Sequence, residues 1–256
     1  MNRCNQPVAG DVFSGYAQTV ARCMQAAGAG AVLDGKRPVM LKPNLVNDSP
    51  HPVTTPPAFC EAVITSVRQY TTAPIVIGEG CGDAHLETSE VFARLGYQDL
   101  ARRQQVALVD LNRSTLVRCE NADCQVFPEM WLPEAVFEHV LISLPVLKAH
   151  SLCRFSGSMK NMLGLAPPSH YSGRFGTWKK AAFHHRLDEA IVDLNRYRGP
   201  DFTVMDATIG LADFHLGGPQ CNPPVNRILA GADARALDRE AAGLLGLDWT
   251  CVGHLK

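Results

Sequence analysis

The sequence predicts a three-layer α/β/α fold with a mostly parallel central sheet. Apolar runs of strand length alternate along the chain with segments whose apolar residues recur at helical spacing, and this order is typical of parallel strands joined by right-handed crossover helices. The strand-length runs are apolar throughout, as expected of strands that helices cover on both faces. With 256 residues, 46% of them hydrophobic, the chain is long enough for one α/β domain spanning residues 1–256.

The first part of the chain contains a predicted helix, a strand and a second helix. Residues 11–27 carry apolar residues at helical spacing, and the glycines that follow can end this helix in the left-handed conformation. Residues 37–46 are predicted as a strand that leaves the sheet at its internal proline, because proline cannot donate to a central ladder. The second helix follows a loop rich in proline and threonine, where Thr54 or Thr55 can cap it.

The middle of the chain continues the alternation of strands and helices. The predicted elements are a strand over 74–80, helices over 88–95 and 98–105, and a strand over 106–111. We interpret the polar segment over 112–134 as a β-hairpin at the edge of the sheet. Residues 140–147 then form a continuous apolar run, which is typical of a parallel strand buried on both faces.

The last part of the chain begins with a long stretch that contains glycines. We interpret residues 167–177 as a mobile lid, followed by an amphipathic helix from Thr177 to Arg198. Strands are predicted over 202–208 and 227–232, and Asp233 is placed to cap the final helix.

Polar groups come directly after the buried run that precedes residue 148. Lys148 and His150 follow this run, and Lys160 and Asn161 lie together farther along the chain, close to Ser158. In open α/β sheets, ligands bind in the crevice beyond the carboxyl ends of the strands. These side chains therefore predict the edge of a pocket.

Two earlier strands also end in polar residues. Lys42 and Asn44 flank a proline at the end of one strand, where spacing alone fits a surface lysine in a turn equally well. Glu79 ends the next strand between two glycines, which allow the backbone to turn sharply and to approach a ligand. It is a candidate metal ligand, base or partner of Lys42, and the structural alternative is a carboxylate that only pairs with a neighbouring lysine.

Asp206 ends a later predicted strand. It is a candidate to orient a lysine or to bind a cation, and pairing with Lys160 is the structural alternative. Helix capping and the helix dipole account for Asp233 and Asp238.

The candidate residues are rich in cationic and amide donors, whose natural complement is a carboxylate, phosphate or enolate oxygen. A lysine among other cations can have its pKa lowered, which suits a base or a Schiff-base nucleophile. The Gly-x4-Gly-Lys-Ser/Thr spacing is absent, which argues against a P-loop kinase or ATPase. We therefore expect a small anionic ligand, with Lys148, His150, Lys160, Glu79 and Asp206 as the candidate catalytic residues.

Charge and composition restrict the partners. A net charge of −1 and a pI near 6.7 lack the basic surface that nucleic acids or anionic membranes require. No apolar run approaches the roughly 20 residues needed to span a bilayer, and the first residues lack the apolar core of a secretory signal. We expect a soluble cytoplasmic protein with no nucleic-acid or membrane partner.

The nine cysteines are scattered and odd in number, so a disulfide framework is not expected. Cys119 and Cys124 form the only close pair, without the further cysteines of a ferredoxin-type cluster loop. We therefore do not expect an iron–sulfur cluster within this chain. Cys81 follows Glu79 at a strand end, where reactivity would matter, although a small buried thiol is the simpler interpretation.

A set of motifs covers nearly the whole chain. They are Leu-Lys-Pro-Asn-Leu-Val (41–46), Gly-Glu-Gly (78–80), Pro-x-Leu-Lys-x-His (145–150), Met-Lys-Asn-Met-Leu-Gly (159–164), Met-Asp-Ala-Thr-Ile-Gly (205–210), Gly-Gly-Pro (217–219) and Ala-Gly-Ala-Asp-Ala-Arg-Ala-Leu-Asp (230–238). Their combination resembles the family of domain-of-unknown-function 362 (DUF362).

The resemblance adds to the candidate site. It favours a site for Lys42 and Asn44, which join Asn161 and Ser158 as candidate ligand-binding residues. It also favours His185 over the adjacent His184, because the family tends to carry a histidine here. The family is often joined to ferredoxin-type iron–sulfur modules, which implies a separate ferredoxin-type protein as a partner of this chain.

Three functions are compatible with these observations. The first is an enzyme that acts on a small anionic metabolite, with lysines and asparagines holding its oxygens and Glu79, His150 or Asp206 transferring a proton or holding a divalent metal. The second is a redox or cofactor-handling protein that works with an external iron–sulfur protein. The third is a ligand-binding module without catalysis. The reaction type and the identity of any metal or cofactor stay open.

Overall fold

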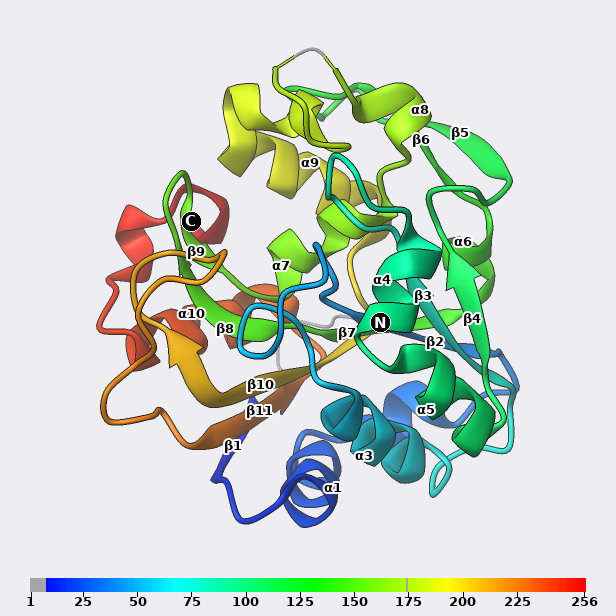
Figure 1. Cartoon of the computed structure of the whole chain (residues 1–256), viewed down its shortest axis with the longest axis vertical. Coiled ribbons are helices and arrows are strands. Elements are labelled where there is room, and N and C mark those ends of the chain that lie inside the picture. Colours follow the sequence, from blue (N-terminus) through cyan, green and yellow to red (C-terminus); the bar gives the residue numbers. More distant parts are fainter. Residues whose placement is uncertain (1–7, 174) are drawn as a thin grey trace.

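The computed structural model describes residues 8–173 and 175–256. Within these ranges a nine-stranded, mostly parallel sheet lies between two layers of helices (Figure 1). The strand order is β1-β11-β10-β7-β2-β3-β4, with β8 paired to β10 and β9 paired to β8. The bounds are β1 (Ala9–Val12), β2 (Val39–Pro43), β3 (Ile75–Glu79), β4 (Ala107–Asp110), β7 (Val140–Leu144), β8 (Val146–His150), β9 (Arg154–Ser156), β10 (Phe202–Leu211) and β11 (Arg227–Gly231). The predicted α/β/α class is confirmed.

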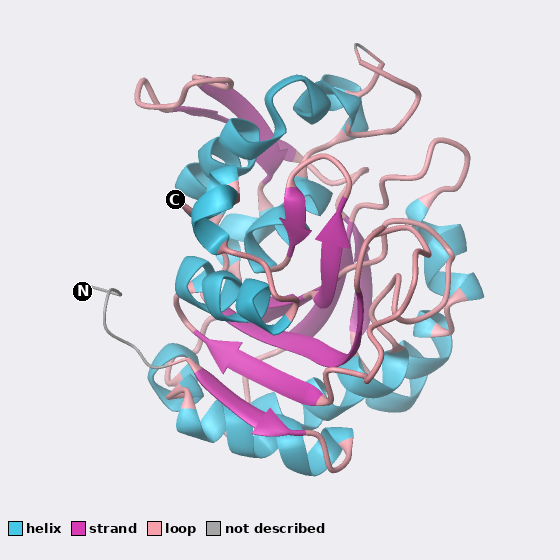
Figure 2. Ribbon diagram, turned by 90° about the vertical axis from the view of Figure 1, so that its left-hand side faces the viewer, coloured by secondary structure: helices cyan, strands magenta, loops and turns pink. Residues whose placement is uncertain are grey.

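Helices cover both faces of the sheet (Figure 2). The first apolar core lies under α1 (Tyr16–Ala26), α2 (Ala29–Leu33), α3 (Pro57–Val67), α4 (Thr88–Arg94) and α5 (Tyr97–Gln104). The second core lies under α6 (Ala135–Glu138), α7 (Ser158–Asn161), α8 (Pro168–Tyr171), α9 (Leu187–Arg198) and α10 (Ala234–Leu244), with the 3-10 helices η1 (Met162–Leu165), η2 (Ala181–Arg186), η3 (Trp249–Cys251) and η4 (Gly253–Leu255). Within the described ranges, no helix combines the length and apolar character that crossing a bilayer requires.

Successive residues of a central strand enter different cores. Val39 and Leu41 of β2 pack into the first core, whereas Met40 packs into the second. In β7, Ile142 packs into the first core and Leu141 into the second. Because side chains alternate along a strand, a strand between two helical layers must be apolar throughout. Each such side chain, when fully buried, contributes about 1.5–3 kcal/mol of hydrophobic free energy.

The apolar run before Lys148 forms two strands, which meet at Pro145. Proline has no N–H for the ladder, and the neighbouring strand β10 changes partner at this point, pairing with β7 at Thr203 and with β8 at Asp206. Lys148 and His150 were expected beyond the end of a strand, but they lie within β8, paired with β9. Two positions apart, they point to the same side of the strand.

Two predicted helices begin later than expected. The helix predicted over 11–27 begins as α1 at Tyr16, because residues 11 and 12 belong to the edge strand β1, which is antiparallel to β11. This tertiary pairing outweighs the local helical pattern. The helix predicted from Thr177 begins at Leu187, after the 3-10 helix η2. Lys180 and Phe183 are both buried, and a three-residue interval matches the 3-10 period.

The two predicted helix caps behave differently. Asp233 accepts the backbone N–H groups of Arg235 and Ala236 and caps α10, as predicted. Thr55 does not cap α3. Its hydroxyl accepts the N–H of Asn44 at 2.8 Å and donates to the carbonyl of Leu144 at 2.7 Å, so it ties the end of β2 to the end of β7.

The predicted hairpin over 112–134 is present as a separate two-stranded antiparallel sheet of β5 (Leu116–Glu120) and β6 (Glu129–Pro133). Asp193 of α9 fixes the loop between its strands, because its buried carboxylate accepts the backbone N–H groups of Gln125, Val126 and Phe127.

Candidate functional site

A cavity of about 230 Å³ lies at the carboxyl edge of the sheet, where β2 and β3 end beside β8 and α7. Its charged and polar lining residues are Lys42, Asn44, Glu79, Lys148, His150, Ser156, Lys160, Asn161, Lys180, His184 and His215. Four of them are lysines, and Glu79 is the only carboxylate that lines the cavity among the described residues. The cavity is therefore strongly biased towards positive charge.

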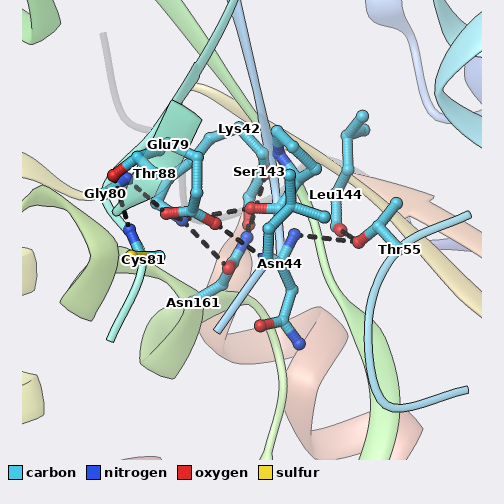
Figure 3. Close-up of polar contacts among 12 residues, drawn as sticks. Lys42, Asn44, Thr55, Glu79, Gly80, Cys81, Thr88, Ser143, Leu144 and Asn161 are labelled. Carbon is cyan, nitrogen blue, oxygen red and sulfur yellow. Dashed lines mark hydrogen bonds and ion pairs between the residues drawn. The ribbon is translucent and has the colours of Figure 1, made fainter. Parts of the chain in front are cut away.

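A saturated group of side chains closes one side of the cavity (Figure 3). Lys42 Nζ donates to Glu79 Oε1 at 2.8 Å and to Asn161 Oδ1 at 3.1 Å. Its third hydrogen bond goes to the carbonyl of Pro43 at 3.1 Å. A lysine ammonium has three donors, so the protein itself satisfies this one completely. We call Lys42, Glu79 and Asn161 the closed network.

Glu79 has little capacity left for a ligand. Its Oε1 also accepts the N–H of Gly80 at 2.8 Å, and its Oε2 accepts the N–H of Leu45 at 2.9 Å. Burial lowers the pKa of Lys42, and the adjacent Glu79 carboxylate opposes that shift. Gly164 packs against this ion pair so closely that an added Cβ would lie 2.1 Å from Glu79 Oε1.

The short helix α7 carries Asn161 and Lys160 and is held from two sides. Asp238 of α10 accepts the backbone N–H groups of Ser158 at 2.7 Å and Met159 at 2.9 Å. Asn161 Nδ2 donates to Ser143 Oγ on β7 at 3.0 Å. These bonds fix the helix against both the sheet and the last helix.

Five further residues line the cavity and are called the open half here: Lys148, Lys160, His150, His184 and His215. Lys148 Nζ donates to the carbonyl of Val53 at 2.7 Å. Burial, and then the charge of Lys160, lower the pKa of Lys148 to about 7. Within the part of the chain that the structure describes, no acceptor contacts the Lys160 ammonium, and burial lowers its pKa as well.

Two stacked imidazoles stand beside these lysines. The rings of His150 and His215 are 3.7 Å apart between centroids and nearly parallel. His150 Nδ1 accepts the N–H of Leu152 at 3.1 Å, which places the proton of the neutral ring on Nε2. Burial and the nearby lysines lower the pKa of His150 strongly and that of His215 to about 3, so both rings are neutral near pH 7.

Lys180 also lines the cavity. Its ammonium donates to Asn112 Oδ1 and to the carbonyl of Ala166. Burial lowers the pKa of Lys180 to about 7, and the charge of Glu79 partly opposes this shift.

The sequence matches a known family model. This model, described as Domain of unknown function (DUF362), matches residues 39–243. The chain belongs to this family. The match includes every strand from β2 to β11 and all the polar residues that line the cavity.

Two individual proteins are similar to this DUF362 chain. The thylakoid-associated protein sll1697 of Synechocystis sp. (strain ATCC 27184 / PCC 6803 / Kazusa) is 26% identical over 218 residues, covering 82% of this chain and 63% of the relative. The chain therefore spans less than two thirds of that protein. The lactate racemase apoprotein of Thermoanaerobacterium thermosaccharolyticum has a TM-score of 0.60 at 13% identity, covering 95% of this chain and 58% of the racemase. The similarity to the racemase is therefore a similarity of fold alone.

The structure brings together most of the residues predicted for the site. Those that line the cavity are Lys42, Asn44, Glu79, Lys148, His150, Lys160 and Asn161. Asn44 also shares an acceptor with Lys148, because its Nδ2 donates to the carbonyl of Val53 at 3.4 Å.

Three predicted site residues, Ser158, Asp206 and His185, lie outside the cavity. Ser158 is fully buried, with its hydroxyl 2.5 Å from that of Thr203 on β10, where it joins α7 to the sheet. Asp206 does not pair with Lys160. It accepts a hydrogen bond from Tyr16 at 2.8 Å, and its Oδ2 lies 3.2 Å from His51 Nε2. Asp206 therefore faces Tyr16 of α1 and His51 instead of the cavity.

The preference for His185 over His184 places the wrong residue at the cavity. His184 lines it, whereas His185 is exposed and stacks on Phe175, with 5.0 Å between ring centroids. The two exchange roles because η2 replaces the predicted helix. The expected lid over 167–177 does not line the cavity in the residues described, which exclude residue 174, and Trp178 is the first lining residue after it.

Four polar cavity residues were not among the predicted site residues, namely Ser156, Lys180, His184 and His215. Lys180 stands in a predicted amphipathic helix, where a lysine normally faces solvent. Its burial comes from Asn112 and Ala166, which are distant in sequence. The glycine-rich turn after β10 was the only local signal near His215, since such turns beyond strands often carry site residues.

Metal and thiol chemistry find little support in this arrangement. Among the described residues, no group of three or more His, Cys, Asp or Glu side chains is placed to hold a metal ion. Every cysteine in those residues is free. Burial raises the pKa of the Cys81 thiol, whose Sγ donates to the carbonyl of Leu86, and burial raises the pKa of Cys119 and Cys124 too. Cys4 lies outside the described residues.

Proposed function

We propose that this DUF362 protein is an enzyme that binds a small carboxylate in the cavity at the carboxyl edge of its sheet. The observation that carries the proposal is the open half, where, in the residues described, Lys160 has no acceptor, Lys148 has one, and neither forms an ion pair with a carboxylate. Lys148 is buried and Lys160 is partly buried, and cations removed from water without an anion are costly. A bound anion would supply the missing charge.

The lowered pKa values support the same proposal. A carboxylate placed between Lys148 and Lys160 favours their charged forms, so its binding raises both pKa values and is coupled to proton uptake. Ammonium–carboxylate hydrogen bonds are among the stronger ones in proteins. The fold resembles that of a protein named for lactate, which is a small carboxylate, and we therefore place carboxylates ahead of phosphate.

His150 is proposed to act on the bound acid through Nε2–H. Its Nδ1 is occupied by a backbone N–H, so the ring is fixed and offers one donor. A neutral imidazole N–H can stabilise negative charge that develops on a ligand oxygen. The closed network would then form a rigid wall of the site. Lys42 and Glu79 would hold this wall in place without contacting the ligand.

Calorimetry tests this function with L-lactate, pyruvate and malonate, and with inorganic phosphate as the alternative anion. We expect a carboxylate to bind with uptake of protons. Lys160→Ala and Lys148→Ala should each weaken binding about 10- to 100-fold, because a hydrogen bond to a charged group contributes about 1.5–3 kcal/mol. Lys36→Ala, at an exposed lysine away from the cavity, serves as the control. Equal carboxylate affinities in all three variants would contradict the proposal. Tighter binding of phosphate than of any carboxylate would make phosphates the substrate class instead.

A cytoplasmic location and a ferredoxin-type iron–sulfur partner remain proposals. The relative from Synechocystis is described as thylakoid-associated, and the partner is supported by the family resemblance alone. Fractionation of cells that produce the tagged chain tests the location, and co-purification under anaerobic conditions tests the partner.

A further inference from the structure

The four lysines that line the cavity differ in how many acceptors hold the side-chain nitrogen. Among the described residues, three acceptors hold Lys42, two hold Lys180, one holds Lys148 and none holds Lys160. A lysine nitrogen that donates three hydrogens is an ammonium ion, which has no lone pair. A nitrogen without acceptors can lose a proton and attack an electrophile.

We infer that Lys160 is the nucleophile of this site, and that the carboxylate it takes is a 2-oxo acid whose carbonyl carbon condenses with the Lys160 amine to form an imine. The inference rests on the proposed function, because the cavity must first hold the acid through its carboxylate. It adds a reacting residue and a narrower substrate class.

The surroundings of Lys160 favour the free amine. Lys148 and His150 face it from β8, His184 from η2 and His215 from the turn after β10. These groups are cationic or neutral, so none of them stabilises an ammonium ion. Burial lowers the pKa of Lys160, and the Cys153 thiol is the one neighbour that opposes this shift.

The other residues of the open half supply what the condensation requires. The Lys160 nitrogen forms a bond to the carbonyl carbon, and the π electrons move to the oxygen, which His150 Nε2–H can stabilise. The nitrogen loses one proton, the oxygen gains one, and the product is a carbinolamine. Lys148 has a pKa of about 7, which suits a proton donor at neutral pH. It protonates the hydroxyl, which leaves as water, and a protonated imine remains.

Reductive trapping tests this step directly. The intact protein is incubated at neutral pH with pyruvate or glyoxylate and cyanoborohydride, and the modified residue is located by peptide mass spectrometry. We expect one reduced adduct on Lys160, formed at least about tenfold faster than on any surface lysine, because each unit by which the pKa is lowered raises the free-amine fraction about tenfold. Adduct formation at Lys160 should level off at a lower pH than at Lys36.

Matched variants separate chemistry from folding. Lys160→Ala and Lys160→Gln should both lose the adduct while retaining a cooperative thermal transition, and Lys36→Ala should keep it. Lys148→Ala should slow trapping at Lys160 without moving the adduct elsewhere. An adduct on Lys148 in the wild-type protein, or adducts spread over surface lysines, would overturn the assignment.

Lactate distinguishes the failure of this inference from the failure of the proposed function. It has the carboxylate but lacks the 2-oxo group that an amine could attack. If lactate and pyruvate both bind in calorimetry and neither oxo acid is trapped on Lys160, the imine is refuted and the carboxylate site stands. If no carboxylate binds, both proposals fall.

Discussion

The two sides of the cavity contain similar side chains in opposite states. In the closed network, every hydrogen of the Lys42 ammonium has an acceptor and Glu79 balances its charge. In the open half, Lys160 has no acceptor among the described residues, and two neutral imidazoles stand beside it. Lysine therefore has a structural role in the closed network, whereas in the open half it is available for chemistry.

The comparison shows that the number of internal partners, more than the residue type or burial, separates a structural lysine from a functional one. Lys42 and Lys148 are almost equally buried, yet one is saturated and the other keeps donors for a ligand. The following predictions test this distinction, beginning with the largest expected effect.

Removing one member of the closed network should cost the most stability. Glu79→Ala leaves the Lys42 ammonium buried without its counter-charge, and we expect a loss of about 3–5 kcal/mol in the free energy of unfolding. Urea denaturation measures the loss. The double variant Lys42→Met/Glu79→Leu removes both charges and should recover most of it. If Glu79→Ala costs no more than a surface substitution, the closed network is not structural.

Gly164→Ala should disturb the same network through sterics alone. The added Cβ would lie 2.1 Å from Glu79 Oε1 and 2.5 Å from Lys42 Nζ, so a shift of the ion pair and a loss of about 1–3 kcal/mol are expected. Gly243→Ala in α10 is the matched control, since nothing lies within 4 Å of its Cβ position. It should be neutral or stabilising by about 0.4–1 kcal/mol. Equal losses in both variants would contradict the close packing at Gly164.

The open half should give the stability a dependence on pH. Lys148 has a pKa of about 7 in the folded chain, below the value of about 10.4 for an unfolded lysine. Between these values the unfolded chain binds more protons, so stability rises with pH by up to about 1.4 kcal/mol per unit. Lys148→Met should flatten this rise between about pH 7 and 8, whereas Lys36→Met should leave it unchanged. If stability rose more steeply with pH in Lys148→Met than in the wild-type protein, the pKa of Lys148 would not be lowered by folding.

Lys160→Met should have the smallest effect on stability. Removing a lysine that has no acceptor breaks no internal hydrogen bond, so we expect a change within about 0.5 kcal/mol or a gain near 1 kcal/mol. Thermal unfolding at neutral pH measures it. A loss comparable to that of Glu79→Ala would show that Lys160 is structural and would erase the difference between the two sides.

The layers of the fold could be predicted from the sequence because their cause is local. Residues 140–147 are apolar throughout, and the strands between two helical layers require that pattern. The exceptions, β1 and η2, depend on partners distant in sequence, such as β11 for residues 9–12.

The candidate site was predictable where polar side chains come at the end of an apolar run in the sequence, as Lys42, Glu79, Lys148 and His150 do. It was not predictable where contacts with residues distant in sequence accompany the direction in which a residue faces. Asp206 contacts Tyr16 and His51 and does not line the cavity, and His184 lines the cavity while His185 stacks on Phe175.

The contact between Asp238 and α7 has a consequence for the order in which the site can assemble. Every cavity-lining residue precedes position 217, yet the carboxylate that receives the Ser158 and Met159 amides belongs to the final long helix. A chain emerging from the ribosome would thus contain all the lining side chains, and the Ser143 and Thr203 partners of α7, before the two backbone hydrogen bonds to Asp238 could form. The last of these contacts on the segment that bears Lys160 therefore depends on the synthesis of α10.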